Sequence, residues 1–384
     1  MSQETLPNAA ESPSSSLLFI MKGTKYCNLR CSYCYEFAHL DDPRRMSLDE
    51  LARFFEDAAS YARRHGVGEV KFTWHGGEPF VIPLSVYERI KELQRAAFAG
   101  IEVVNGVQTN LTILTDRHVE YLKSGAFFDT VSTSFDVYGD QRVDRRGRPT
   151  TDIVLDNMQW LADAGVTFAT ICVLSRGTAA RIVDIYRFFE EAGVNCRILP
   201  FHRAMDGAGD HGLALPQAEI VARLCDVFNA WRDAGEPVIV RPLADLTNIA
   251  ERFIFGDERR VYDKAVDEWA YVVNPNGDLW GISEIEDNRF HYGNVFTGSL
   301  EEALASKVRA DGVAASRRNI EILCAGCPYH GYCTGYPMAD PTEGFFETAR
   351  REGCHARGVL DHIVARLEAD GTADAIRAEA AATV

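Results

Sequence analysis

The sequence predicts an α/β protein in which helices cover a parallel sheet, with cysteine clusters near both ends of the chain. Three observations support this prediction. Six short apolar runs alternate with helical stretches, turn residues separate them, and seven of the ten cysteines gather near the two ends. Parallel strands need crossover connections, so the alternation indicates a partial barrel or a doubly wound sheet, and periodicity alone does not separate these two.

The six predicted strands are short, rich in β-branched or aromatic residues, and followed by turn signals. They are Ser16–Met21, Glu69–Thr73, Glu102–Gln108, Thr130–Phe135, Phe168–Val173 and Asn195–Pro200. The stretches between them repeat apolar residues at helical spacing, and these are Leu48–His65, Val86–Ala99, Asp116–Lys123, Thr151–Ala164 and Ala179–Ala192. A capping box at Ser47 and Glu50 opens the first helix, and Gly125, Gly165 and Gly193 stand where helices should end.

The pattern changes beyond the sixth strand. Residues Pro216–Ala234 predict one more helix, whereas Pro237–Trp269 is less regular and predicts a linker. A strand–turn–strand pattern with an Asn-Gly-Asp tip begins a second domain near Tyr271, and an amphipathic helix starts at His355. We therefore expect a disordered leader (1–16), a first domain (17–235), a linker (236–270), a cysteine-bearing domain (271–360) and a C-terminal helix and tail (361–384).

Composition excludes several classes of function. The formal net charge of −16 disfavours nucleic acid as a partner, because an acidic surface repels phosphate backbones. No apolar run approaches the length of a membrane span, and the run before the first turn is too short for a signal peptide. We expect a cytoplasmic protein with no membrane partner, and clustered cysteines in a reducing compartment indicate metal ligands.

The first cysteine cluster forms a Cx3Cx2C loop after the first strand, with Cys27, Cys31 and Cys34 as its members. Three thiolates on a compact loop suit a [4Fe–4S] cluster that keeps one iron free of protein ligands. That iron can chelate the amino and carboxylate groups of S-adenosylmethionine. A zinc site is the alternative, but structural zinc takes four protein ligands and His39 is the single nearby candidate for the fourth.

With Tyr33 before its last cysteine, this loop resembles the radical S-adenosylmethionine (SAM) superfamily. The chain is similar to the peptide- and protein-modifying branch, which includes anaerobic sulfatase-maturating enzymes and ribosomal-peptide or cyclophane maturases, and the resemblance covers residues 17–354. It implies a partial (β/α)6 TIM-type barrel with a small C-terminal cysteine-rich SPASM/twitch-like domain. It also implies reductive cleavage of SAM to a 5′-deoxyadenosyl radical, with the cofactor performing the difficult chemistry.

Further motifs extend the resemblance and imply cofactor-binding residues. Trp74-His75-Gly76-Gly77-Glu78-Pro79 matches the family's GGEP element, which implies that Gly76, Gly77 and Glu78 bind the methionyl amino group. Gln108-Thr109-Asn110 matches the family's QTN, although Leu111 replaces the glycine that usually follows. The fourth strand ends in a match to S-x-D, which implies a cofactor contact from Ser134 with Asp136 beside it. Arg142 matches the arginine that pairs with the cofactor carboxylate, and Arg145 or Arg146 could substitute for it.

The second cysteine cluster reads Cx2Cx5Cx20C and consists of Cys324, Cys327, Cys333 and Cys354. Four thiolates can close an iron–sulfur cluster completely, and a four-cysteine zinc site has the same ligand count. The pattern resembles the outer auxiliary [4Fe–4S] site of the SPASM extension. We therefore expect a second, auxiliary [4Fe–4S] cluster here.

The chain departs from a full SPASM extension in two ways. The inner auxiliary cluster uses a cysteine after the hairpin and another four residues beyond the third cysteine, where this chain has Ile282 and Pro337. We expect that cluster to be absent. The sulfatase-maturating relatives use an aspartate directly after the hairpin cysteine as a proton acceptor, and Ser283 stands there instead. Glu284 is the candidate general base, and a solvated surface glutamate is the alternative.

The predicted function is hydrogen abstraction from a ribosomally made peptide, followed by a cyclophane-type C–C crosslink or by oxidation. The leader residues are too few for a recognition domain, so we expect a separate leader-binding protein or a short substrate. A flavodoxin or ferredoxin would supply the electron. The alternative is a dehydrogenase, decarboxylase or epimerase of a sugar- or nucleoside-type small molecule, and a third hypothesis is a catalytically silent metal-binding scaffold.

Overall fold

A computed structural model of the chain describes residues 16–201, 212–281, 288–341 and 343–383. Within these residues ten strands form one sheet in the order β10-β9-β8-β1-β2-β3-β4-β5-β6-β7. Seven of them run parallel as a partial barrel: β1 (Ser16–Thr24), β2 (Glu69–Gly76), β3 (Glu102–Thr109), β4 (Thr130–Ser134), β5 (Ala169–Leu174), β6 (Cys196–Pro200) and β7 (Val240–Arg241). The partial barrel implied by the family resemblance is confirmed.

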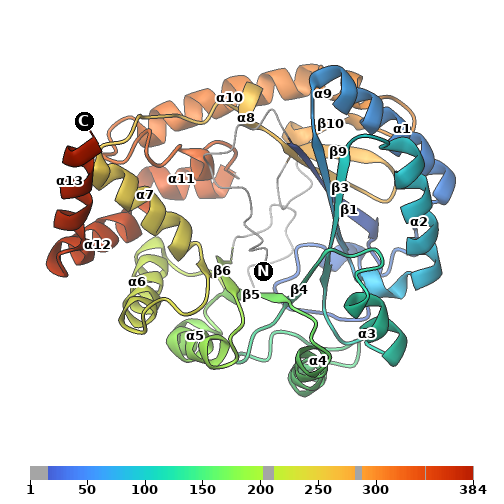
Figure 1. Cartoon of the computed structure of the whole chain (residues 1–384), viewed down its shortest axis with the longest axis horizontal. Helices are drawn as coiled ribbons and strands as arrows, with labels where there is room; N and C mark the ends of the chain where they lie inside the picture. Colours follow the sequence, from blue (N-terminus) through green and yellow to red (C-terminus); the bar gives the residue numbers. More distant parts are fainter. Residues whose placement is uncertain (1–15, 202–211, 282–287, 342, 384) are drawn as a thin grey trace.

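Helices cross from strand to strand on the outer face of this sheet (Figure 1). The crossovers are α1 (Leu48–His65), α2 (Leu84–Ala97), α3 (Asp116–Lys123), α4 (Thr151–Asp163), α5 (Ile182–Glu191) and α6 (Gln217–Asp233). The capping box of Ser47 and Glu50 is present at the start of α1. Gly125, Gly165 and Gly193 adopt positive φ angles of 58°, 77° and 64° after their helices, as a left-handed helix end favours.

The main core lies between the strands and these helices. Phe19 of β1 packs edge-on against Phe54 of α1 with ring centroids 5.1 Å apart, and Phe72 of β2 meets Phe55 at 5.2 Å. Side chains alternate across a strand. Because Phe72 and Trp74 face the helices, their neighbours Thr73 and His75 face the concave side of the barrel. The candidate site is built on that side and at the carboxyl ends of the strands.

Residues 237–269, predicted to be less regular than the segments before them, contain regular structure, and that expected irregularity was wrong. The linker bounds (236–270) stay a prediction. Helix α7 (Leu243–Phe255) follows β7 and is followed by the short helix α8 (Lys264–Asp267). Pro242 precedes α7, and Gly256 ends it in the left-handed conformation with a φ of 84°. Leu243, Leu246 and Ala250 provide a buried helical stripe, so the apolar periodicity was present in the sequence.

The predicted hairpin is formed by β8 (Ala270–Val273) and β9 (Asp278–Gly281), with β10 (His291–Asn294) beside them. Gly277 at its tip has a φ of 90° and donates to the carbonyl of Asn274. Strand β8 pairs in parallel with β1, so the hairpin extends the barrel sheet. The remaining helices are α9 (Leu300–Leu304), α10 (Lys307–Cys324), α11 (Glu343–Glu352), α12 (His355–Ala369) and α13 (Thr372–Thr383).

Candidate active site

The Cx3Cx2C loop leaves the carboxyl end of β1 and is held by two other loops. Cys27 and Cys31 are buried and Cys34 is half-buried. The amide of Arg30 donates to the carbonyl of Val143 at 2.7 Å, and the amide of Ser32 donates to that of Gln141 at 2.9 Å. The loop after β4 therefore packs directly on the cysteine loop and brings the predicted arginine region to it.

Two glycines let the turn after β2 approach the same loop. The amide of Gly77 donates to the carbonyl of Thr24 at 2.9 Å, and a Cβ at Gly77 would lie 2.1 Å from the carbonyl oxygen of Tyr26. Gly76 has a φ of 109°, and its Cβ would lie 2.3 Å from the oxygen of Thr24. No side chain fits at either position, so the glycines are required by the contact between the two backbones.

Glu78 lies completely buried behind this turn and acts as a brace between strand ends. Its carboxylate accepts hydrogen bonds from the hydroxyl of Thr109 at 2.6 Å, the amide of Asn110 at 2.7 Å and the amide of Phe80 at 2.9 Å. Burial raises the pKa of Glu78, and these three hydrogen bonds oppose that rise. The predicted contact with a cofactor amino group remains a prediction, although a carboxylate retains lone pairs for it.

Arg142 is buried against the cysteine loop, and its predicted pairing with the cofactor carboxylate stays a prediction. Its Nη1 donates to the hydroxyl of Tyr33 at 2.8 Å, and its Nε has no hydrogen-bond partner within the described residues. Asp136 lies close by, where burial raises its pKa and Arg142 opposes the rise. Arg145 instead lies at the surface and pairs with Asp41 at 2.6 Å. A buried guanidinium with a free N–H suits a ligand carboxylate.

Ser134 ends β4 on the same side of the sheet and is oriented by Gln108. The side-chain amide of Gln108 donates to Ser134 Oγ at 3.0 Å, while its Oε1 accepts a hydrogen bond from Ser132. Because Ser134 accepts from Gln108, its own hydroxyl hydrogen is available to a ligand. This arrangement suits the cofactor contact predicted for Ser134.

Beside the cysteine loop lies a buried cluster of charged side chains that was not predicted from the sequence. Lys22 forms an ion pair with Glu36, and Lys25 Nζ lies 3.4 Å from the second carboxylate oxygen of Glu36. His75, which pairs in register with Lys22, accepts the amide of Gly76 at its Nδ1. Burial and the Lys22 charge lower the pKa of His75 to about 4. A lysine closing an otherwise apolar strand was the available signal in the sequence.

The three thiols of the loop are the candidate ligands of an iron–sulfur cluster. Within the described residues, no three Cys, His, Asp or Glu side chains converge as ligands of one metal ion, and all ten cysteines are free. Burial raises the pKa of Cys27 to about 11 and that of Cys34 to about 12, so cluster binding must release protons.

The second cluster of cysteines also comes together in space. Cys324 ends α10, Cys327 and Cys333 lie in the loop that follows, and Cys354 precedes α12. Burial raises the pKa of Cys324 to about 12, and the other three thiols raise it further. Burial also raises the pKa of Cys354, while the backbone N–H groups of Arg357 and Ala356 oppose this. Backbone N–H groups at the start of a helix stabilise a thiolate. Because the thiolate is the form that binds metal, they favour Cys354 as a metal ligand.

Some predicted positions lie outside the described residues: Ile282, Ser283, Glu284 and Glu286. Pro337 is described, in a short 3-10 helix, Tyr336–Met338. The proposed base Glu284 therefore has no structural account and stays a prediction. No helix within the described part of the chain is long and apolar enough to cross a bilayer.

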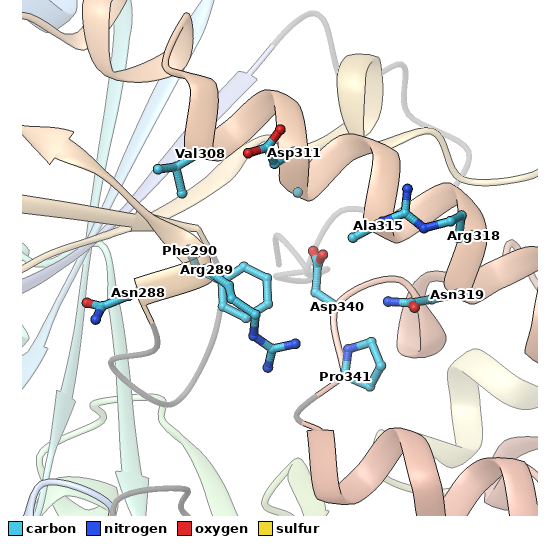
Figure 2. Close-up of a pocket in the computed structure, with 11 residues that line it drawn as sticks. Asn288, Arg289, Phe290, Val308, Asp311, Ala315, Arg318, Asn319, Asp340 and Pro341 are labelled. Carbon is cyan, nitrogen blue, oxygen red and sulfur yellow. The ribbon is translucent and has the colours of Figure 1, made fainter.

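A cavity of about 460 Å³ opens between α10, residues 288–290 and the loop at residues 340–341, where Arg289 and Asp340 point into it (Figure 2). Its other charged lining residues are Asp311 and Arg318. None of its described lining residues belongs to the cysteine loop or to the ends of β1 to β6. The cavity is therefore separate from the candidate active site.

Comparison with known proteins agrees with this geometry. Residues 21–189 match the family described as the radical SAM superfamily. The chain is 31% identical over 347 residues to a serine-type anaerobic sulfatase-maturating enzyme of Klebsiella pneumoniae, covering 85% of this chain and 86% of that protein. It is 27% identical over 337 residues to the serine-type enzyme of Bacteroides thetaiotaomicron, covering 80% and 79%.

Two solved structures share the fold. Native anSMEcpe with bound AdoMet and a Cp18Cys peptide superposes with a TM-score of 0.67 at 20% identity, covering 91% of this chain and 99% of that one. Streptococcus suis SuiB bound to its precursor peptide SuiA gives a TM-score of 0.55 at 15% identity, covering 78% and 67%. At these identities the likeness concerns the fold alone.

Proposed function

Because the chain belongs to the radical SAM superfamily, in the family of the anaerobic sulfatase-maturating enzymes, we propose that it abstracts a hydrogen atom from a residue of a peptide substrate. The main observation in support of this proposal is that the cysteine loop, the glycine turn and the buried Arg142 meet at one edge of the barrel. The similarity to sulfatase-maturating enzymes over most of both chains supports a peptide as the substrate.

The residues of the site have distinct proposed roles. Cys27, Cys31 and Cys34 would hold a [4Fe–4S] cluster, and the cluster with SAM supplies a 5′-deoxyadenosyl radical when both are bound. Arg142 would pair with the SAM carboxylate through its free N–H, and Ser134 would donate its hydroxyl hydrogen to the cofactor. Gly76 and Gly77 keep side chains away from the place where the two loops meet.

The outcome we propose for the peptide is a net two-electron oxidation. One hydrogen atom leaves on 5′-deoxyadenosine, and one electron from a reduced flavodoxin or ferredoxin is consumed in cleaving SAM. The peptide radical then loses a proton and passes one electron to an oxidised electron-transfer protein. Its carbon either forms a C–C bond to a second residue, as in a cyclophane-type crosslink, or becomes part of a new double bond.

The oxidation performed by sulfatase-maturating relatives does not transfer directly to this chain. The family resemblance implies that Ser283 stands where those relatives carry their proton-accepting aspartate. This replacement favours a crosslink over a sulfatase-type oxidation, with Glu284 as the proposed base. A second residue of the substrate would then be an aromatic side chain.

We also propose an auxiliary [4Fe–4S] cluster on Cys324, Cys327, Cys333 and Cys354, because their thiols gather in space and receive backbone donors. Such a cluster supplies an electron-transfer site or braces the fold. A separate leader-binding protein is the partner we propose for a substrate with a leader. We propose a cytoplasmic location, because clustered cysteines that would bind iron–sulfur clusters suit a reducing compartment.

The test uses the full chain, reconstituted anaerobically with iron and sulfide. The reduced protein is incubated with SAM and with short synthetic peptides rich in aromatic residues, and 5′-deoxyadenosine and peptide mass are measured together. We expect 5′-deoxyadenosine and a peptide lighter by two hydrogen atoms, and neither with the Cys27→Ala/Cys31→Ala/Cys34→Ala variant. Turnover coupled to sugars or nucleosides, with peptides left unchanged, would instead establish the small-molecule alternative.

A further inference from the structure

Asn110 follows β3, and its side-chain amide bridges the cysteine loop and Thr112. Its backbone amide donates to Glu78 at 2.7 Å. Its side-chain nitrogen Nδ2 lies 3.7 Å from Cys27 Sγ and 2.9 Å from Asn28 Oδ1. Its side-chain oxygen accepts hydrogen bonds from the amide and the hydroxyl of Thr112, at 2.9 Å and 2.6 Å.

These contacts determine which end of the Asn110 amide faces the sulfur. The backbone N–H of Thr112 can only donate, so the atom that meets it must be the carboxamide oxygen. The NH2 group then points toward Cys27, and a flipped amide would place two donors together. The hydroxyl of Thr112 also accepts from Asn28 Nδ2 at 2.7 Å, which holds this network in place.

Cys27 Sγ thus receives an N–H from a side chain in addition to the backbone N–H of Leu29 at 3.4 Å. Hydrogen bonds to cluster sulfurs stabilise the more negative, reduced state and raise the reduction potential. Asn110 is 8% exposed, so water does not easily replace its donor. A single amide there can influence both the placement of the loop and its electronic properties.

We propose that Asn110 is a positioning residue that donates a hydrogen bond to the Cys27 thiolate and raises the reduction potential of the cluster bound there. The inference rests on the proposed function only in requiring that the loop binds a [4Fe–4S] cluster. It needs no peptide substrate. It gives the Asn110 side chain a role in the reductive step, whereas the QTN match in the sequence assigned it none.

The test compares Asn110→Ala with Asn105→Ala in the reconstituted protein. Asn105 is a matched control because it is a buried amide on β3, the strand that Asn110 follows, and it is bonded to Trp74 at 3.0 Å and to Gln94 at 2.9 Å. Reduction potentials are measured by titration monitored with electron paramagnetic resonance, in variants that also carry Cys324→Ala/Cys354→Ala to leave one cluster. We expect a more negative potential for Asn110→Ala and the wild-type value for Asn105→Ala.

A second measurement covers the case in which Asn110→Ala loses its cluster. Wild-type protein labelled with ¹⁵N in asparagine side chains should show a ¹⁵N coupling to the reduced cluster in pulsed resonance spectra. An unchanged potential in Asn110→Ala, or no such coupling in the wild type, would overturn the proposal. Failure of the wild type to bind iron at all would contradict the proposed function instead, so the two failures are distinguishable.

Discussion

Arg142 and Tyr33 are joined by a hydrogen bond of 2.8 Å between the guanidinium and the phenolic oxygen, although 109 positions separate them in the sequence. Tyr33 stands inside the cysteine loop, so this contact ties the loop after β4 to the metal-binding motif. The remaining Nε of Arg142 is buried and lacks a partner among the described residues. A buried donor left unpaired costs free energy, and a bound carboxylate would remove that cost.

Arg142→Met should therefore weaken SAM binding strongly. We expect the dissociation constant for SAM to rise at least tenfold, which corresponds to about 1.4 kcal/mol, because a buried charge-assisted hydrogen bond is lost. Calorimetric titration of SAM into the reconstituted protein measures this change. Arg145→Met is the control, since Arg145 pairs at the surface with Asp41 and should bind SAM like the wild type. Equal affinity in both variants would contradict the role given to Arg142.

His75 predicts a dependence of stability on pH. The folded-state pKa of His75 is about 4, below its usual value of 6.5. Between these two pH values the imidazole is protonated in the unfolded chain and neutral in the folded chain. The contribution of His75 to the free energy of unfolding is therefore complete above pH 6.5 and decreases as the pH falls toward 4. Between pH 7.5 and pH 5, we expect the free energy of unfolding of His75→Gln to fall by about 2 kcal/mol less than that of the wild type. Urea unfolding of the cluster-free protein at both pH values measures this, and equal losses would contradict the prediction.

Much of the barrel followed from the sequence because its signals are local. The helices Leu48–His65 and Asp116–Lys123 were predicted with the bounds they have, since the apolar spacing lies within each segment and a capping box opens the first of them. The site residues could be expected together because parallel strands end at one edge of the sheet. Helix α7 was missed although the buried stripe of Leu243, Leu246 and Ala250 repeats at helical spacing in the sequence.

Contacts between distant segments could not be predicted in this way. Lys22 forms its ion pair with Glu36, on the far side of the cysteine loop. The sequence around neither residue indicates that the two side chains meet. The orientation of the Asn110 amide depends on Thr112 two residues later and on Cys27 far upstream. Such networks arise only after the loops pack, and sequence periodicity carries no information about them.

A buried ion network stabilises the region beyond the barrel. Lys264 has no exposed surface, and its Nζ contacts Asp340 and lies 2.8 Å from Glu268 Oε1. Arg309 of α10 donates to the other oxygen of Glu268 at 2.8 Å. These contacts join α8, α10 and the loop that bears Asp340, at the edge of the cavity in Figure 2.

Lys264→Met should destabilise the protein, because it removes the buried cation that contacts both Glu268 and Asp340. We expect a loss of about 3–5 kcal/mol in the free energy of unfolding, as removal of one partner of a buried ion pair typically causes. Lys307→Met is the matched control, since Lys307 forms an exposed pair with Asp311, and exposed pairs contribute little. Denaturant unfolding of both variants measures the difference, and similar stabilities would show that the network contributes nothing.

The four-cysteine site can be separated from the catalytic one by metal content. We expect about eight irons in the reconstituted wild type and about four in Cys324→Ala/Cys354→Ala, because each [4Fe–4S] cluster carries four. The double variant should still cleave SAM to 5′-deoxyadenosine, since Cys27, Cys31 and Cys34 remain. Cys225→Ala is the control, because this half-buried thiol belongs to neither cluster and should leave the iron content unchanged. About four irons with bound zinc in the wild type would mean that the C-terminal site is structural, and an electron-transfer role there would be wrong.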